Sequence, residues 1–130
     1  MPLDLHLATG SSVPLWEQIT RGVRLQIFQE ALRPGEPMPS VRALAEQLVV
    51  NPNTVAKAYG VLQRAGVLVT QPGRGVFVAE RRDVFSKRER RHRLAEAATT
   101  LLHVGVEVGA SADEIREALE AELRLLKKSA

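Results

Sequence analysis

The first third of this chain has apolar residues at helical spacing. From Pro14 to about Leu32 they recur at every fourth position, which places them on one stripe of a helix. Proline is tolerated in the first turn, and the breakers of residues 33–37 cannot continue a helix. We therefore predict a helix over 14–32, preceded by an irregular arm over 1–12. The predicted stripe consists of Leu15, Ile19, Val23 and Ile27, widened by Trp16 and Phe28.

Two shorter helices are predicted next. Ser40 is a good N-cap for residues 41–48, and Asn51, with Pro52 behind it, is a good N-cap for residues 52–65. Apolar residues in each follow the spacing i, i+3, i+4, i+7, which gives one buried face. These faces are Val41, Leu44, Ala45 and Leu48 in the first helix, and Val55, Ala58, Tyr59 and Leu62 in the second.

A β-hairpin is predicted after the third helix. The apolar runs 67–70 and 76–78 are joined by Gln71-Pro72-Gly73-Arg74-Gly75, and two glycines in so short a connection are typical of a hairpin tip. With the three helices, this order is that of a winged helix-turn-helix.

The rest of the chain, residues 80–130, is expected to be a helical arm. One helix is predicted from Glu80 to about Val104, and Gly105 and Gly109 are expected to bracket a loop. Residues 111–114 read as a capping box that opens a final helix. The two apolar stripes cannot cover each other from water, so a second copy is expected to complete a four-helix arrangement. We assign to this dimerisation surface Leu94, Ala98, Leu101, Leu102, Ile115, Leu119, Leu123 and Leu126.

Composition excludes several classes of function. Apolar residues are 45% and charged residues 25% of the 130 residues, as in an ordinary soluble protein. With no cysteine, disulfides, thiol nucleophiles and Cys-based metal sites are excluded. We see no secretion signal and no apolar run long enough for a membrane span, so we expect a cytoplasmic protein. His6, His92 and His103 are scattered and have no carboxylate at ligand spacing, so we expect no metal site and no cofactor.

Charge is distributed unevenly along the chain. Residues 81–93 contain seven Lys or Arg against two acidic residues, whereas residues 94–130 contain four against seven. A basic segment of this kind suggests a polyanionic partner. Three interpretations of residues 81–93 stay open: a solvated helix face, phosphate contacts flanking a DNA site, or ion pairs with the acidic last helix.

The second helix of the motif is the predicted recognition helix. We expect the first helix to pack across it through the small Ala45 and Val55, so that its N-terminal turn enters the major groove. Asn53, Thr54 and Lys57 lie off the buried face. These residue types can meet adenine, a thymine methyl, and guanine or phosphate, respectively, and the helix N-terminus also favours a phosphate.

Residues 32–78 resemble the DNA-binding domain of the GntR family of bacterial transcription regulators. The resemblance rests on LRPGEPMPSVRALAEQL, NPNTVAKAY and GRGVFV, in this order and at the family's distances. The short segment after the wing is similar to that of the YtrA-type subfamily. The resemblance implies DNA contacts from Arg42, Asn53, Thr54, Lys57, Gly73 and Arg74.

This chain departs from the family pattern at two positions. Val49 stands in the turn where many members have glycine, and Pro52 stands where many have arginine. A β-branched residue resists positive φ, so Val49 is the unusual residue of the turn. Pro52 removes one expected DNA contact.

We therefore expect a mostly α protein with a small β-hairpin wing: a winged helix-turn-helix domain over 1–79 and a two-helix dimerisation arm over 80–130. The predicted function is a homodimeric, sequence-specific regulator, more specifically a repressor of its own operon, that binds a pseudo-palindromic double-stranded DNA operator. Subfamily resemblance implies that such an operon often encodes an ABC transporter. The competing hypothesis is a winged-helix module that binds DNA non-specifically or docks another protein. An enzyme is not expected, because the chain has no room for a pyridoxal phosphate domain of the aminotransferase-fused members.

Overall fold

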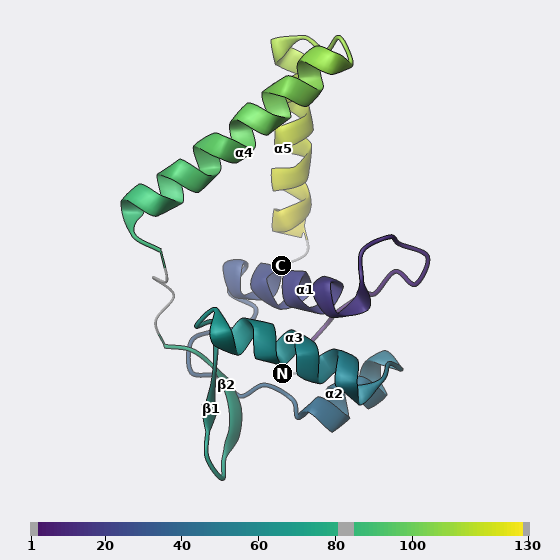
Figure 1. The fold of residues 1–130 in the computed structure, drawn as a ribbon, viewed down its shortest axis with the longest axis vertical. Coiled ribbons are helices and arrows are strands. Elements are labelled where there is room, and N and C mark those ends of the chain that lie inside the picture. Colours follow the sequence, from purple (N-terminus) through teal and green to yellow (C-terminus); the bar gives the residue numbers. More distant parts are fainter. Residues whose placement is uncertain (1–2, 81–84, 129–130) are drawn as a thin grey trace. The chain divides into compact units, whose positions relative to one another are not determined.

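A computed structural model describes residues 3–80 and 85–128 and divides the chain into two units, Met1–Val84 and Phe85–Ala130 (Figure 1). The described residues are mostly helical with a two-stranded antiparallel sheet, which confirms the predicted fold class. The first unit contains α1 (Leu15–Phe28), α2 (Val41–Leu48), α3 (Pro52–Arg64), β1 (Leu68–Gln71) and β2 (Gly75–Val78). The second contains α4 (Lys87–Glu107) and α5 (Ala112–Lys128).

Helix α1 ends at Phe28, four residues before the predicted end at Leu32. Glu30 adopts a left-handed conformation with φ 63°, and the Ala31 N–H donates to the Gln26 carbonyl oxygen at 2.9 Å, which closes the helix. Phe28 is 68% exposed, so its assignment to the buried stripe is wrong.

Helices α2 and α3 of the helix-turn-helix begin at the predicted residues, after the N-caps Ser40 and Asn51. The Ser40 hydroxyl accepts from the Ala43 N–H at 3.0 Å, and the Asn51 side-chain oxygen accepts from the Asn53 N–H at 2.8 Å. Each cap satisfies a backbone donor that the first turn of a helix cannot satisfy itself. The buried residues of both helices include Ala45 and Val55, the pair expected at their crossing.

The turn between α2 and α3 forms with valine in the left-handed region. Val49 has φ 55°. The Val50 N–H donates to the Ala45 carbonyl oxygen at 3.0 Å, and the Val49 N–H donates to the Glu46 carbonyl oxygen at 3.3 Å, the pattern of a Schellman ending. The Val49 side chain is 88% exposed. The resistance of a β-branched residue to positive φ is thus overcome, because two hydrogen bonds close the turn and nothing crowds the side chain.

The wing is a hairpin with a third segment on its edge. β1 pairs with β2 in antiparallel register, with Leu68 opposite Val78. The Met38 N–H donates to the Val76 carbonyl oxygen, and the Val78 N–H donates to the Glu36 carbonyl oxygen, both at 2.8 Å. From the sequence, residues 33–37 are expected only to end the preceding helix. In the structure, residues 35–38 also form hydrogen bonds with β2.

The N-terminal arm is irregular, as predicted, but it belongs to the core. Leu3 is buried, and Leu5 lies against Gly22 so closely that any side chain there would collide with it. The Gln47 side-chain amide donates to the Leu3 carbonyl oxygen at 2.6 Å. The core of the first unit comprises Leu3, Ile19, Val23, Ile27, Leu32, Met38, Leu44, Ala45, Val55, Ala58, Tyr59, Leu62, Leu68 and Val78.

Tyr59 connects α3 to the segment before α2. It is buried, its hydroxyl donates to the Pro39 carbonyl oxygen at 2.7 Å, and burial raises its pKa above the ordinary range. Replacement of Tyr59 by Phe leaves the Pro39 carbonyl oxygen without this donor. We expect the free energy of unfolding to fall by about 1–3 kcal/mol. The melting temperature should fall by roughly 4–8 °C for each kcal/mol.

The stability difference between the wild-type and this variant should depend on pH. The unfolded tyrosine ionises near pH 10, whereas the folded one does not, so the wild-type loses stability as the pH rises above about 10. The gap between wild-type and Tyr59→Phe melting temperatures should therefore narrow there. Equal melting temperatures at neutral pH would contradict the role of this hydrogen bond.

Helix α4 is displaced from its predicted range. It begins at Lys87, where the Ser86 hydroxyl accepts from the Glu89 N–H at 3.1 Å, instead of at Glu80. Residues 81–84 of the predicted helix lie outside the described residues. The helix continues through Gly105 to Glu107, so the loop predicted to begin at Gly105 is wrong at that end.

The predicted start of α5 is confirmed. The Ser111 hydroxyl accepts from the Glu114 N–H, and the Glu114 carboxylate accepts from the Ser111 N–H, both at 3.1 Å. This is the reciprocal capping box that the sequence predicts. Gly109, with φ 71°, makes the turn before it.

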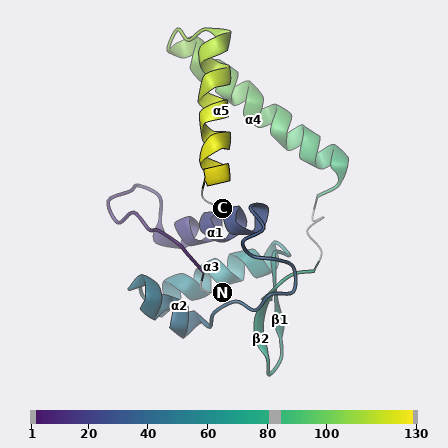
Figure 2. The ribbon, with the colours of Figure 1, turned by 180° about the vertical axis from the view of Figure 1, so that it is seen from behind.

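Helices α4 and α5 lie close near their connection and separate away from it (Figures 1 and 2). Gly105 is buried, and a Cβ there would lie 2.5 Å from Ile115 Cδ1, so Ile115 packs against α4 of its own chain. Other apolar residues of the tail are uncovered, including Leu119 at 51% and Leu123 at 42% exposure. None of the described helices is both long and apolar enough to cross a membrane.

Candidate nucleic-acid interface

Helix α3 has one buried face and one free face. The buried face packs against α1 and α2 and consists of Val55, Ala58, Tyr59 and Leu62. Asn53 and Lys57 are exposed and Thr54 is half-buried. The structure therefore places the three predicted contact residues outside the core, on the N-terminal half of the helix.

The backbone at this helix N-terminus is already hydrogen-bonded. Pro52 has no N–H, the Asn53 N–H is bonded to the Asn51 side chain, and the Thr54 N–H donates to the Asn51 carbonyl oxygen at 2.9 Å. The first free donors of the helix are thus used by its own cap, and the expectation that this N-terminus favours a phosphate stays a prediction. We therefore base the expected DNA contacts of this turn on its side chains.

Lys57 has an aromatic neighbour on another helix. Its Nζ lies 4.7 Å from the centroid of the Trp16 ring of α1. Trp16 is half-buried and packs against the core, as expected, with one face towards the lysine. Local spacing could not reveal this contact, because the two residues are forty-one positions apart on separate helices.

The wing tip carries Arg74 between two residues with positive φ, Gly73 at 76° and Gly75 at 116°. Arg74 and Gly73 are exposed, and the Arg74 guanidinium carbon lies 5.5 Å from the centroid of the Phe77 ring. Only glycine adopts these angles without strain, so the backbone of the tip depends on them.

Arg42 is exposed in the first turn of α2. Among residues 3–80, no ion pair joins Arg42, Lys57 or Arg74 to a carboxylate. Cations without acidic partners attract a polyanion such as the DNA backbone, and Asn53 can bind the edge of a base.

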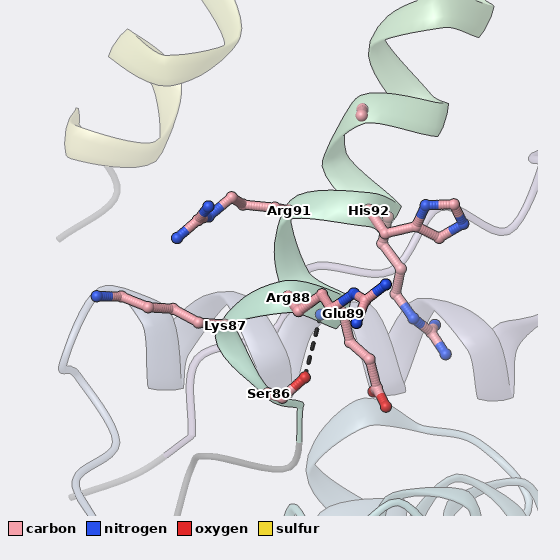
Figure 3. Close-up of a pocket in the computed structure, with 8 residues that line it drawn as sticks. Ser86, Lys87, Arg88, Glu89, Arg91 and His92 are labelled. Atoms are coloured by element: carbon pink, nitrogen blue, oxygen red, sulfur yellow. Dashed lines mark hydrogen bonds between the residues drawn. The ribbon is translucent and has the colours of Figure 1, made fainter.

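A second basic surface lies on the N-terminal end of α4. Lys87 and Arg91 extend from the same side of the helix, and both are exposed (Figure 3). The surface pocket here is lined only by residues of this one segment, namely Ser86, Lys87, Arg88, Glu89, Arg91, His92, Arg93 and Ala95. Among the side chains of residues 85–126, no ion pair connects α4 to the acidic residues of α5, so the salt-bridge interpretation finds no support within one copy.

The histidines differ in one respect from the prediction. The ring of His6 lies 3.2 Å from Asp4 Oδ1, and the ring of His92 lies 2.6 Å from Glu96 Oε1. Two of the three thus have a carboxylate beside them, because i, i+4 spacing on a helix and a short loop both allow it. In the part of the chain that the structure describes, no group of three His, Asp or Glu residues could hold a metal ion.

Comparison with known proteins identifies relatives of the first unit. Residues 15–78 match the family model described as bacterial regulatory proteins, gntR family. The transcriptional repressor YtrA of Bacillus subtilis is 40% identical over 76 residues, which are 58% of this chain and 58% of YtrA. The matched stretch is therefore less than two thirds of that relative's own length.

Solved structures show the same architecture. A transcriptional antiterminator from Listeria monocytogenes matches with TM-score 0.84 and 29% identity, over 95% of this chain and 92% of its own. YtrA from Sulfolobus acidocaldarius, a GntR-family transcription factor, matches with TM-score 0.62 and 30% identity, over 74% of this chain and 97% of its own.

A further similar structure is AraR(DBD) in complex with operator ORX1, with TM-score 0.53 and 28% identity over 61% of this chain and 99% of its own. These relatives are transcriptional regulators and not enzymes, which fits the prediction of a non-enzyme. The chain has a winged helix-turn-helix with an exposed polar turn, and its similarity to the Sulfolobus protein covers nearly the whole length of that protein. We conclude that the chain belongs to the GntR family of bacterial transcription regulators.

Proposed function

We propose that this protein is a cytoplasmic, homodimeric repressor that binds a pseudo-palindromic operator through α3 in the major groove. The observation that carries the proposal is the free N-terminal half of α3, with Asn53 and Lys57 exposed and a hydrogen-bonded turn holding α2 across it. Major-groove readout by a helix requires this combination of a rigid mount and free polar side chains.

We assign the roles as follows. Residues 1–79 bind DNA, with Asn53 and Thr54 at base edges, Lys57 and Arg42 at phosphates or flanking bases, and Gly73 with Arg74 at the wing. Residues 80–130 hold the dimer together. Repression is inferred from the similarity to YtrA, a named repressor, and autoregulation from the subfamily resemblance.

Selection of bound duplexes from a random DNA pool tests this proposal. We expect an inverted repeat with half-sites about one helical turn apart and an affinity at least about 10³-fold above that for a shuffled duplex. The selected sequence should also occur upstream of the protein's own gene. An affinity ratio near unity would favour the alternative, a non-specific or protein-docking module.

The wing provides a separate prediction. Replacing Arg74 with Ala should weaken operator binding by about 1.5–3 kcal/mol, since a guanidinium hydrogen bond to a charged group is lost. The melting temperature should change by less than about 3 °C, because surface substitutions cost within about 0.5 kcal/mol. Gel-shift titration and thermal melting measure the two effects. A loss of stability that matched the loss of affinity would instead give Arg74 a structural role.

A further inference from the structure

We propose that Trp16 is a positioning residue for DNA binding: its indole ring holds the Lys57 side chain in the conformation that reaches a phosphate. This role rests on the proposed function, and it extends the DNA-binding machinery to α1, to a residue that makes no predicted DNA contact.

The contact has the geometry of a cation–π interaction. Lys57 Nζ lies 4.7 Å from the centre of the ring, within the distance of about 6 Å over which a cation is attracted by an aromatic face. Tryptophan attracts a cation more strongly than tyrosine or phenylalanine.

The two partners differ in mobility, and this determines which one positions the other. Trp16 is half-buried and packs against the core, so its ring is a fixed platform. Lys57 is exposed, and a lysine side chain has four rotatable bonds that lose their freedom when it binds a phosphate. A lysine already ordered on the ring has less freedom left to lose.

The ammonium group remains available to DNA. It carries three donors and no acceptor, and among the described residues no ion pair engages it. The ring lies on one side of the ammonium group, and Lys57 as a residue is exposed, so a phosphate can approach while the ring still contacts the side chain. Among residues 3–80, the other predicted cations of this surface have no such platform on a neighbouring helix: Arg74 lies over Phe77, on its own hairpin.

The free protein tests the contact without any DNA. Ring-current shifts should move the Lys57 Hε resonances upfield in the wild-type, and Trp16→Leu should abolish this shift. Trp16 is the chain's only tryptophan, so Lys57→Met should also change the emission of the free protein. Random-coil Hε shifts in the wild-type would overturn the proposal, whatever the protein does with DNA.

A double-mutant cycle tests the role in binding, with the duplex selected from the random pool as the probe and a shuffled duplex beside it. Trp16→Leu should lower affinity about two- to fivefold for each half-site, and Trp16→Tyr should restore most of it. In the Lys57→Ala background, Trp16→Leu should have no further effect. As the matched control, Phe28→Leu removes an exposed aromatic ring from the other end of α1 and should leave affinity unchanged.

The outcomes separate the two proposals. Equal losses from Trp16→Leu with and without Lys57 would overturn the positioning role while leaving the DNA-binding function intact. A wild-type protein that bound both duplexes equally would refute the proposed function, and the positioning role in specific binding with it, even though the resonance shifts persisted.

Discussion

Replacing both Leu119 and Leu123 with Asp should convert the protein to a monomer and lower its operator affinity by about two orders of magnitude or more. The two leucines lie one turn apart on α5 and are 51% and 42% exposed within one copy. We propose that a second copy covers them. Asp at these positions would then place two carboxylates in an apolar seam, where an unpaired charge is strongly unfavourable.

Loss of the dimer weakens DNA binding through effective concentration. In a dimer, binding of one subunit to its half-site holds the recognition helix of the second subunit near the other half-site. This raises the overall affinity by about 10²–10⁴-fold without any new contact. The monomer loses this gain, although each α3 is unchanged. Sedimentation equilibrium and gel-shift titration on the selected duplex measure the two effects together.

A charge-matched control separates dimerisation from general repulsion of DNA. Ala121→Asp with Arg124→Gln makes the same change of two negative charges at exposed positions on the opposite side of α5. This variant should remain dimeric and lose little affinity. If the variant with both Leu119→Asp and Leu123→Asp stayed dimeric, the proposal that the tail forms the dimer would be wrong. A chain that ends at residue 80 gives a second test. If it were still dimeric and bound the operator with unchanged affinity, self-association would lie in the first unit.

Replacing Asn53 with Ala should reduce affinity by about 1–3 kcal/mol for each half-site and relax the preference at one base pair in each. A bidentate amide contact with a base cannot be replaced by a methyl group or by water in the same geometry. The effect is large because a dimer presents two copies of Asn53 to one operator.

The fold should tolerate this substitution. The N-cap is Asn51, whose side chain accepts from the backbone of Asn53 and not from its amide. Alanine also has the highest helix propensity, so the melting temperature should stay equal or rise. A competition titration against single-base variants of the selected duplex detects the relaxed preference.

Two comparisons make this result specific. Lys57→Ala, which removes a predicted phosphate contact, should weaken binding to all duplexes alike. It should also lower the slope of log affinity against log salt concentration by about one for each half-site. Thr9→Ala removes an exposed polar group from the N-terminal arm and should change nothing. Wild-type affinity for both Asn53→Ala and Lys57→Ala would contradict the assignment of α3 as the recognition helix.

The sequence by itself determined the features whose causes are local. Ser40, Asn51 and Ser111 each accept a hydrogen bond from a backbone N–H two or three residues later, so a short stretch of sequence contains the whole cause of each helix start. The periodic apolar faces of α2 and α3 are local in the same sense. The exposed positions of Asn53 and Lys57 follow, because they are the positions that those faces leave over.

Only the tertiary structure decided the features that depend on residues far apart in the chain. The ring of Trp16 contacts Lys57, and Leu3 of the N-terminal arm is buried in the core. Residues 35–38 form hydrogen bonds with the edge of β2. Packing also continued α4 through Gly105, where the glycine makes room for Ile115. Intrinsic preferences for or against a helix amount to about 1 kcal/mol per residue, so packing between distant segments overrides them wherever the two disagree.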